Sequence, residues 1–133
     1  MGAEKILVVD DEHEVLQLLK IELSGEGFQV FTASNGQEAV QKAQMVNPHL
    51  ILMDIMLPDL SGGDVVKMLK DDTKTSDIPV VFLTALLTKR DHESNKLLNV
   101  NDQPYLSIAK PFTSEELLSK IQIALKGSKN KQK

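Results

Sequence analysis

Short apolar runs alternate along this chain with longer segments in which apolar residues recur at helical spacing. The runs are rich in Val, Ile and Leu and predict five strands, at approximately residues 5–10, 28–32, 50–54, 79–84 and 105–109. This alternation is typical of repeated strand–helix units around a parallel sheet. The first, third and fourth runs are apolar nearly throughout, so we expect them at the centre of the sheet, where helices cover both faces.

Three stripes of apolar residues predict helices between and after the strands. They consist of Val15, Leu16, Leu19 and Leu23; of Ala39, Val40, Ala43 and Val46; and of Leu117, Ile121, Ala124 and Leu125. Asn35 is followed three positions later by Glu38, and Thr113 by Glu116, which is the pattern of a helix N-terminus with its capping residue. The polar residues 99–104 predict a loop.

The length and composition indicate one globular domain. With 133 residues, of which 41% are hydrophobic and 26% charged, the chain suffices for one core and is too short for two. We expect the domain to span residues 1–126. The basic residues 127–133 contain no apolar side chain, and we expect them to form a short disordered tail.

The charge and the absent residue types exclude several functions. A formal net charge of -4 argues against a nucleic-acid surface, since phosphate backbones are bound by clustered Lys and Arg. The absence of cysteine excludes disulfides, thiolate zinc sites and cysteine catalysis. No apolar run approaches the ~18 residues of a membrane span, and no signal segment opens the chain. We therefore expect a cytoplasmic protein whose partners are other proteins or metal ions.

Five polar residues stand where predicted strands end, and four separate strands contribute them. Asp10 and Asp11 follow the first strand, Asp54 ends the third, Thr84 ends the fourth and Lys110 follows the fifth. In open parallel sheets, ligands bind outside the carboxyl ends of the strands. Two carboxylates ~4 Å apart repel by ~4 kcal/mol at an effective dielectric constant of ~20. The acidic group therefore predicts a divalent cation or a nearby lysine.

These residues and their surroundings resemble the receiver domain of two-component response regulators. The matching stretches are Ile6-Leu-Val-Val-Asp-Asp-Glu, Asn35-Gly-Gln-Glu-Ala, Leu50-Ile-Leu-Met-Asp-Ile-Met-Leu-Pro with Ser61-Gly62, Val80-Val-Phe-Leu-Thr-Ala, and Lys110-Pro-Phe. The resemblance covers nearly the whole chain. It implies an α/β, flavodoxin-like (CheY-like) fold, in which a doubly wound parallel sheet of five strands, in the order 2-1-3-4-5, has five flanking helices.

The resemblance implies that Asp54 accepts a phosphoryl group from a phosphohistidine on a partner, either a histidine kinase or a phosphotransfer protein. The reaction would need Mg²⁺, a hard cation that prefers oxygen ligands. Its protein ligands would be Asp11 and Asp54 directly, Asp10 through a water, and the carbonyl of Met56. Lys110 would bind a phosphoryl oxygen as a point charge and, before phosphorylation, pair with Asp54.

The resemblance also implies a signalling role without turnover of a diffusible substrate, so we do not expect an enzyme. Thr84 would donate its hydroxyl to the phosphoryl group and move inward. The peptide bond between Lys110 and Pro111 would be cis. An aromatic residue on the fifth strand would follow Thr84, which changes the surface of helix four, strand five and helix five that controls an output partner.

The segment between Thr84 and Lys110 departs from the family pattern. It is longer than usual by about one helical turn, ~4 residues. Tyr105 fits the switch aromatic best, but it precedes Lys110 by five positions where three are usual, and strict spacing selects Ser107. The alternative is that Tyr105 packs as an ordinary amphipathic strand residue.

Three other functions stay open on the sequence. A receiver that docks without being phosphorylated would fit the altered spacing before Lys110. A haloacid dehalogenase-type phosphatase also uses a strand-end Asp with Mg²⁺, but it places a second Asp two positions later, where this chain has Met56. A flavodoxin-like binding module needs a phosphate loop, and the acids after the first strand would repel that phosphate. Dimerisation through the last helices is also open.

Overall fold

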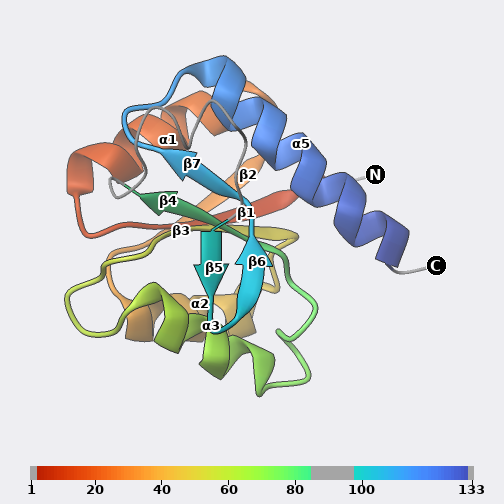
Figure 1. Ribbon diagram of the computed structural model, residues 1–133. Coiled ribbons are helices and arrows are strands. Elements are labelled where there is room, and N and C mark those ends of the chain that lie inside the picture. Colours follow the sequence, from red (N-terminus) through yellow and green to blue (C-terminus); the bar gives the residue numbers. More distant parts are fainter. Residues whose placement is uncertain (1–2, 85–97, 132–133) are drawn as a thin grey trace.

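The computed structural model describes residues 3–84 and 98–131 and shows a sheet between two layers of helices (Figure 1). The strands in these residues are β1 (Lys5–Val9), β2 (Gln29–Ala33), β3 (Leu50–Asp54), β4 (Val80–Thr84), β5 (Leu98–Val100), β6 (Gln103–Tyr105) and β7 (Ser107–Ala109). The helices in the same residues are α1 (His13–Gly25), α2 (Gly36–Val46), α3 (Gly62–Lys70) and α5 (Ser114–Lys131).

Five of the strands form one parallel sheet, in the order β2-β1-β3-β4-β7. Counted along the chain, this is the predicted order 2-1-3-4-5, which the structure confirms. The central strands are β1, β3 and β4, the three that are apolar nearly throughout, and β4 is buried along its whole length. The absence of exposed polar positions in these strands follows from cover on both faces.

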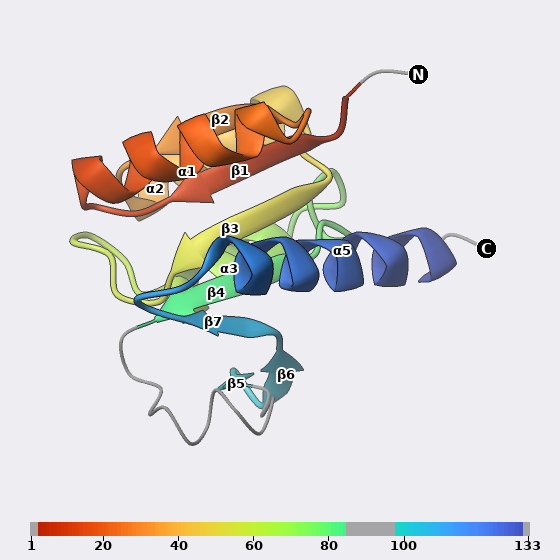
Figure 2. The same cartoon turned by 90° about the horizontal axis from the view of Figure 1, so that it is seen from above.

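Two helices cover each face of the sheet. α1 packs on β1 and β2, and α5 packs on β3, β4 and β7, so both lie on one side (Figure 2). α2 and α3 lie on the other side (Figure 1). The predicted fifth flanking helix would fall between β4 and β5, on residues 85–97, which lie outside the described residues.

Alternation along the strands divides the core into two clusters. In β1, Ile6 and Val8 join the cluster under α1 and α5, while Leu7 and Val9 join the cluster under α2 and α3. All four side chains are fully buried. Burying one such side chain contributes about 1.5–3 kcal/mol. A one-residue slip of the strand would exchange the two sets, so the clusters also fix where each strand ends.

The helices begin where the capping patterns predict. The Asn35 Oδ1 atom accepts a hydrogen bond of 2.8 Å from the Glu38 amide, and α2 starts at the next residue. The Thr113 hydroxyl accepts one of 3.1 Å from the Glu116 amide, and the Glu116 carboxylate accepts one of 3.1 Å from the Thr113 amide. Each cap supplies a partner to an amide that the first helical turn leaves free. Both predicted helix starts are confirmed.

The loop predicted over residues 99–104 is wrong, because β5 and β6 form an antiparallel hairpin there. Two residues, Asn101 and Asp102, connect the strands, with φ angles of 55° and 62°. Positive φ at both positions is the geometry of a type I′ turn, whose twist matches that of the paired strands. The fifth strand of the main sheet therefore begins at Ser107, and Tyr105 belongs to the hairpin instead.

The C-terminal helix is longer than expected. α5 continues to Lys131, so the structure differs from the expected disordered tail over residues 127–131. Residues 127–131 are Gly, Ser, Lys, Asn and Lys, so helix propensity does not explain the continuation, and only the basic residues near the helix C-terminus favour it. The domain boundary at residue 126 stays a prediction. Among the helices of the described residues, none is long and apolar enough to cross a membrane.

Candidate functional site

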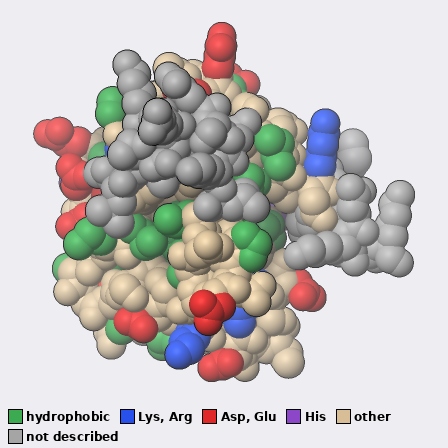
Figure 3. Space-filling model, viewed as in Figure 1, with side chains coloured by type: hydrophobic (Ala, Val, Ile, Leu, Met, Phe, Trp, Pro, Cys, Tyr) green, Lys and Arg blue, Asp and Glu red, His purple; other side chains and the backbone are tan. Residues whose placement is uncertain are grey.

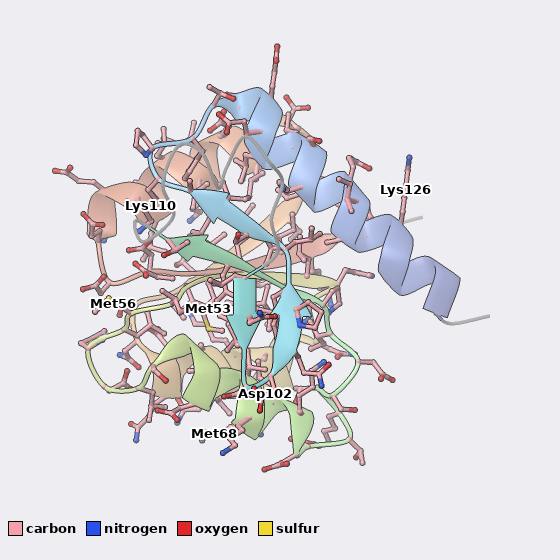
Figure 4. All side chains as sticks on the ribbon, viewed as in Figure 1. Met53, Met56, Met68, Asp102, Lys110 and Lys126 are labelled. Carbon is pink, nitrogen blue, oxygen red and sulfur yellow. The ribbon has the colours of Figure 1, made fainter. Side chains whose placement is uncertain are left out.

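The parallel register brings the ends of four strands to one edge of the sheet. Val9, the last residue of β1, pairs with Met53, and Asp10 and Asp54 follow these two residues. Thr84, the last residue of β4, pairs with Ala109, which precedes Lys110. Figure 4 shows Lys110 and Met56 at this same edge of the molecule. The sequence-predicted residues from separate strands therefore gather at one place.

Lys110 lies at the centre of this gathering. Its Nζ atom is 2.7 Å from Oδ2 of Asp10, 3.0 Å from Oδ2 of Asp54 and 3.6 Å from Oε1 of Glu12. The side chains of Asp10, Asp54 and Lys110 are 0%, 13% and 16% exposed, so water screens these charges poorly. The ammonium group is the cation that the crowded carboxylates require.

Burial and pairing act in opposite directions on the two deepest charges. Burial raises the pKa of Asp10 above its ordinary value, although hydrogen bonds from the Lys110 ammonium and the Glu12 amide oppose this change. Burial favours a lower pKa for Lys110, but the hydrogen bonds to Asp10 and Asp54 outweigh it and raise that pKa. Lys110 is therefore held in its charged form.

The Asp54 carboxylate is fixed at both oxygen atoms. Its Oδ1 atom accepts a hydrogen bond of 2.9 Å from the Met56 amide, and its Oδ2 atom accepts the bond from Lys110. The following residue is anchored as well, since the Ile55 amide donates to the Leu83 carbonyl at 3.2 Å. A carboxylate held in this way at the rim of the sheet can react without a large change of side-chain orientation.

Three carboxylates form a compact oxygen-rich group. Asp10, Glu12 and Asp54 each offer an oxygen atom, and these atoms lie within 4.8 Å of one another. Carboxylate oxygens at a site that is partly open to solvent suit Mg²⁺ or Ca²⁺. The donor set thus fits the divalent cation predicted from the sequence, with Lys110 beside it.

The acidic group differs from the predicted ligand set in one member. Asp11 is exposed, and within the described residues its carboxylate is not part of this group, whereas Glu12 is. The chain bends at Asp11, and the Glu12 amide donates a hydrogen bond of 2.9 Å to the Asp10 carboxylate. This local turn brings Glu12 next to Asp10. Aspartate often binds the backbone two residues further on in this way, and the sequence reasoning missed that signal.

The remaining predicted residues are placed as follows. Thr84 is fully buried, and its carbonyl accepts a hydrogen bond of 3.0 Å from the Lys110 amide. The Lys110–Pro111 peptide bond is cis. Met56 is 66% exposed, and its role as a carbonyl ligand stays a prediction. Tyr105 lies in the hairpin, where its ring meets Phe82, so its role as a switch also stays a prediction.

Comparison with known proteins identifies the family. The family model described as the response regulator receiver domain matches residues 6–122. The chain therefore belongs to the response regulator receiver domain family, whose members are signalling domains in two-component systems and not enzymes in the usual sense.

Similar curated proteins include two transcriptional regulators. The chain is 37% identical over 125 residues to the alkaline phosphatase synthesis transcriptional regulatory protein PhoP of Bacillus subtilis, covering 94% of this chain and 50% of that protein. It is 38% identical over 130 residues to the probable transcriptional regulator ycf27 of Cyanophora paradoxa, covering 98% of this chain and 52% of that protein. The chain thus spans about half the length of these relatives.

Solved structures agree with the fold. The CheY-like receiver domain protein of Methanospirillum hungatei matches with a TM-score of 0.81 and 25% identity, covering 98% of this chain and 99% of that one. The chemotaxis response regulator CheY4 of Vibrio cholerae matches with a TM-score of 0.77 and 28% identity, covering 92% and 99%. The CheY-like fold expected from the sequence is confirmed.

Proposed function

We propose that this domain is a phosphoacceptor switch in which Asp54 receives a phosphoryl group from a phosphohistidine in a Mg²⁺-dependent reaction. The observation that carries the proposal is the position of the Lys110 ammonium, which binds Asp54 at 3.0 Å and Asp10 at 2.7 Å. A cation in that place serves the acceptor before the reaction and can serve a phosphoryl oxygen afterwards.

The chemistry is a direct transfer. An Asp54 oxygen forms a bond to phosphorus while the bond from phosphorus to the donor imidazole nitrogen breaks, and that nitrogen keeps the electron pair. A bound Mg²⁺ ion would neutralise charge on the phosphoryl oxygens. Asp10, Glu12 and Asp54 are the side chains that would hold it, and the predicted direct ligand Asp11 could join them after a change of side-chain orientation.

The partners in this proposal are proteins. A receiver domain implies a histidine kinase, and we infer that the donor is such a kinase or a histidine phosphotransfer protein. Among the described residues, Lys side chains on the face shown in Figure 3 are interspersed with Asp and Glu, which supports protein recognition over nucleic-acid binding by this domain. We place the reaction in the cytoplasm, and propose an output through the surface of helix four, strand five and helix five that the family resemblance implies.

The experiment is incubation with acetyl phosphate and Mg²⁺, followed by intact mass measurement. The wild-type domain should gain one phosphoryl group, and Asp54→Asn should not. Asp72→Asn, which alters an aspartate near the end of α3, should gain the group as the wild type does. Removal of Mg²⁺ with a chelator should abolish the gain. An equal gain by Asp54→Asn would contradict the assignment of the acceptor.

Docking without phosphorylation is the second candidate function. It is favoured by the β5–β6 hairpin, because this element changes the region before Lys110 that carries the signal in the family. The same experiment separates the two candidates. A wild-type domain that is folded and binds Mg²⁺, but gains no phosphoryl group, would support docking alone.

A further inference from the structure

The loop between β3 and α3 is closed on itself directly after the acceptor. The Gly62 amide donates to the Ile55 carbonyl at 2.7 Å, and Met56 and Ser61 form an isolated antiparallel bridge. The Met56 amide is bound to the Asp54 carboxylate. The backbone of residues 55–61 therefore determines the orientation of the acceptor side chain.

Asp59, which lies in this loop, binds the N-terminus of α2. Its Oδ1 atom accepts a hydrogen bond of 2.7 Å from the Gly36 amide, and its Oδ2 atom accepts one of 3.0 Å from the Gln37 amide. These amides belong to the first helical turn, which has no other backbone partner for them and carries the positive end of the helix dipole. The hydrogen bonds from Gly36 and Gln37 lower the pKa of Asp59 below its ordinary value, although the side chain is exposed.

An apolar contact also holds the loop of residues 55–61 against the start of α2. A Cβ atom placed on Gly36 would lie 2.9 Å from Cβ of Leu60 and 3.0 Å from a methyl group of Val65. Such distances are closer than carbon atoms tolerate, so only glycine allows the loop to approach α2 this closely. Asp59 and Leu60 together seat the loop on the first residue of the helix.

The segment that leads into α2 is also tied to Asp10. The Asp10 amide donates to the Ala33 carbonyl at 3.1 Å, and α2 begins three residues after Ala33. The start of α2 thus contacts the loop after Asp54 through the Asp59 carboxylate, and the backbone of Asp10 is bound to the end of β2, the strand that leads into α2.

We propose that Asp59 is a positioning residue for the acceptor site, which acts by holding the loop of residues 55–61 against α2. This inference rests on the proposed function, because it assigns to Asp59 the alignment of Asp54 with the other carboxylates. Asp59 itself contacts neither the cation nor the phosphoryl group. Residues that orient metal ligands from behind typically change metal affinity by roughly 10–100-fold when they are removed.

The test compares Asp59→Ala and Asp59→Asn with a matched control. Asp72 also joins two elements, since its carboxylate accepts a hydrogen bond of 2.9 Å from the Gln44 side chain in the last turn of α2. Asp72→Ala therefore removes a similar contact remote from the site. For each variant, titration calorimetry on the unphosphorylated domain measures Mg²⁺ affinity. Incubation with acetyl phosphate measures the phosphorylation rate, and urea unfolding measures stability.

Asp59→Ala should weaken Mg²⁺ binding by roughly tenfold and slow phosphorylation at subsaturating Mg²⁺, with recovery as the Mg²⁺ concentration is raised. Asp59→Asn keeps one acceptor oxygen and should fall between Asp59→Ala and the wild type. Asp72→Ala should leave Mg²⁺ affinity unchanged. A folded Asp59→Ala with wild-type Mg²⁺ affinity, or an equal loss in Asp72→Ala, would overturn the inference. Because Mg²⁺ affinity is read without phosphorylation, it tests Asp59 even if Asp54 proves not to be the acceptor.

Discussion

The ring of Tyr105 meets the ring of Phe82 edge to face, with centroids 5.3 Å apart and an angle of 83° between the planes. Phe82 is fully buried in β4, two residues before Thr84. Tyr105 closes the hairpin. Edge-to-face pairs are favoured by the charge distribution of aromatic rings and add about 0.5–1.5 kcal/mol beyond burial. The pair therefore connects the hairpin to the strand that carries Thr84.

This packing predicts an unusual titration of the phenol. Burial raises the pKa of Tyr105 above its ordinary value, because the charged phenolate loses hydration. Tyr105 is the only tyrosine, and the chain has no tryptophan, so tyrosinate absorbance reports this side chain alone. In the folded domain the titration midpoint should lie above the value of about 10 that the unfolded chain shows in concentrated guanidinium chloride.

The raised pKa of Tyr105 also predicts how stability changes with pH. Below about pH 10 the phenol is protonated in both the folded and the unfolded state, and its contribution to the free energy of unfolding is fully present. Between the unfolded and the folded pKa only the unfolded state loses the proton, so the free energy of unfolding falls as pH rises. The free energy of unfolding of Tyr105→Phe, measured in urea, should fall less steeply across this range, because this variant lacks the phenol. A midpoint equal to that of the unfolded chain would contradict the packing.

The strands and the helix starts could be predicted because their signals are local and agree with one another, whereas the strand order was implied by the family resemblance. An apolar run such as 50–53 must be buried on both faces, and a capping residue such as Asn35 acts on its own helix. The hairpin could not be predicted in this way. Its strands have three residues each, and neither shows enough alternation to be separated from a polar loop.

The sequence predicted the site as residues at the ends of strands. This prediction was right for residues whose place depends only on where a strand ends. Asp10, Asp54 and Lys110 meet because parallel strands in register end at one edge. The choice between Asp11 and Glu12 depends on backbone direction after β1, which apolar patterning does not report. Tyr105 was predicted in the fifth strand of the sheet but lies in β6 of the hairpin. Apolar patterning does not report the turn at residues 101–102, which reverses the chain before Tyr105.

Removal of the Lys110 ammonium should destabilise the domain strongly. Lys110→Met keeps the side-chain volume but leaves the buried Asp10 carboxylate without its cation, and breaking a buried pair in this way costs about 3–5 kcal/mol. The measurement is the free energy of unfolding in urea at pH 7. Adding Asp10→Asn to Lys110→Met should recover part of the loss, because the uncompensated charge is then absent.

A surface lysine provides the control for that loss. Lys42 pairs with Glu38 at 3.5 Å, and both side chains are 36% exposed. Lys42→Met should cost about 1–2 kcal/mol, because it removes this weak ion pair and the hydrogen bond from Lys42 to the Thr32 carbonyl. If Lys110→Met were no more damaging than Lys42→Met, the pairing of Lys110 with Asp10 would contribute little to the folded state.

The hairpin turn allows a stabilising substitution. Asp102 has φ of 62° at the second position of the turn, a conformation that costs most side chains roughly 1 kcal/mol and glycine very little. Asp102→Gly gives the Asn-Gly sequence preferred in type I′ turns and should raise the free energy of unfolding by roughly 0.5 kcal/mol. Asp102→Val should lower it by about 1–2 kcal/mol. Urea unfolding of both variants checks the turn, and the opposite order would contradict it.

Two glycines of similar sequence context should respond oppositely to alanine. A Cβ atom on Gly62 would lie 2.8 Å from a ring carbon of Phe82 and 3.0 Å from Cα of Ile55, so neither neighbour can move without disturbing the loop after Asp54. Gly62→Ala should destabilise the domain by about 1–3 kcal/mol.

Gly25, at the end of α1, has no atom within 4 Å of an added Cβ. Gly25→Ala should be neutral or stabilise by up to about 1 kcal/mol, because alanine favours the helix. Thermal and urea unfolding measure both variants, and phosphorylation by acetyl phosphate should slow only in Gly62→Ala. Equal stability of Gly62→Ala and Gly25→Ala would show that α3 can move away from Phe82. The close contact between Gly62 and β4 would then not be required for folding.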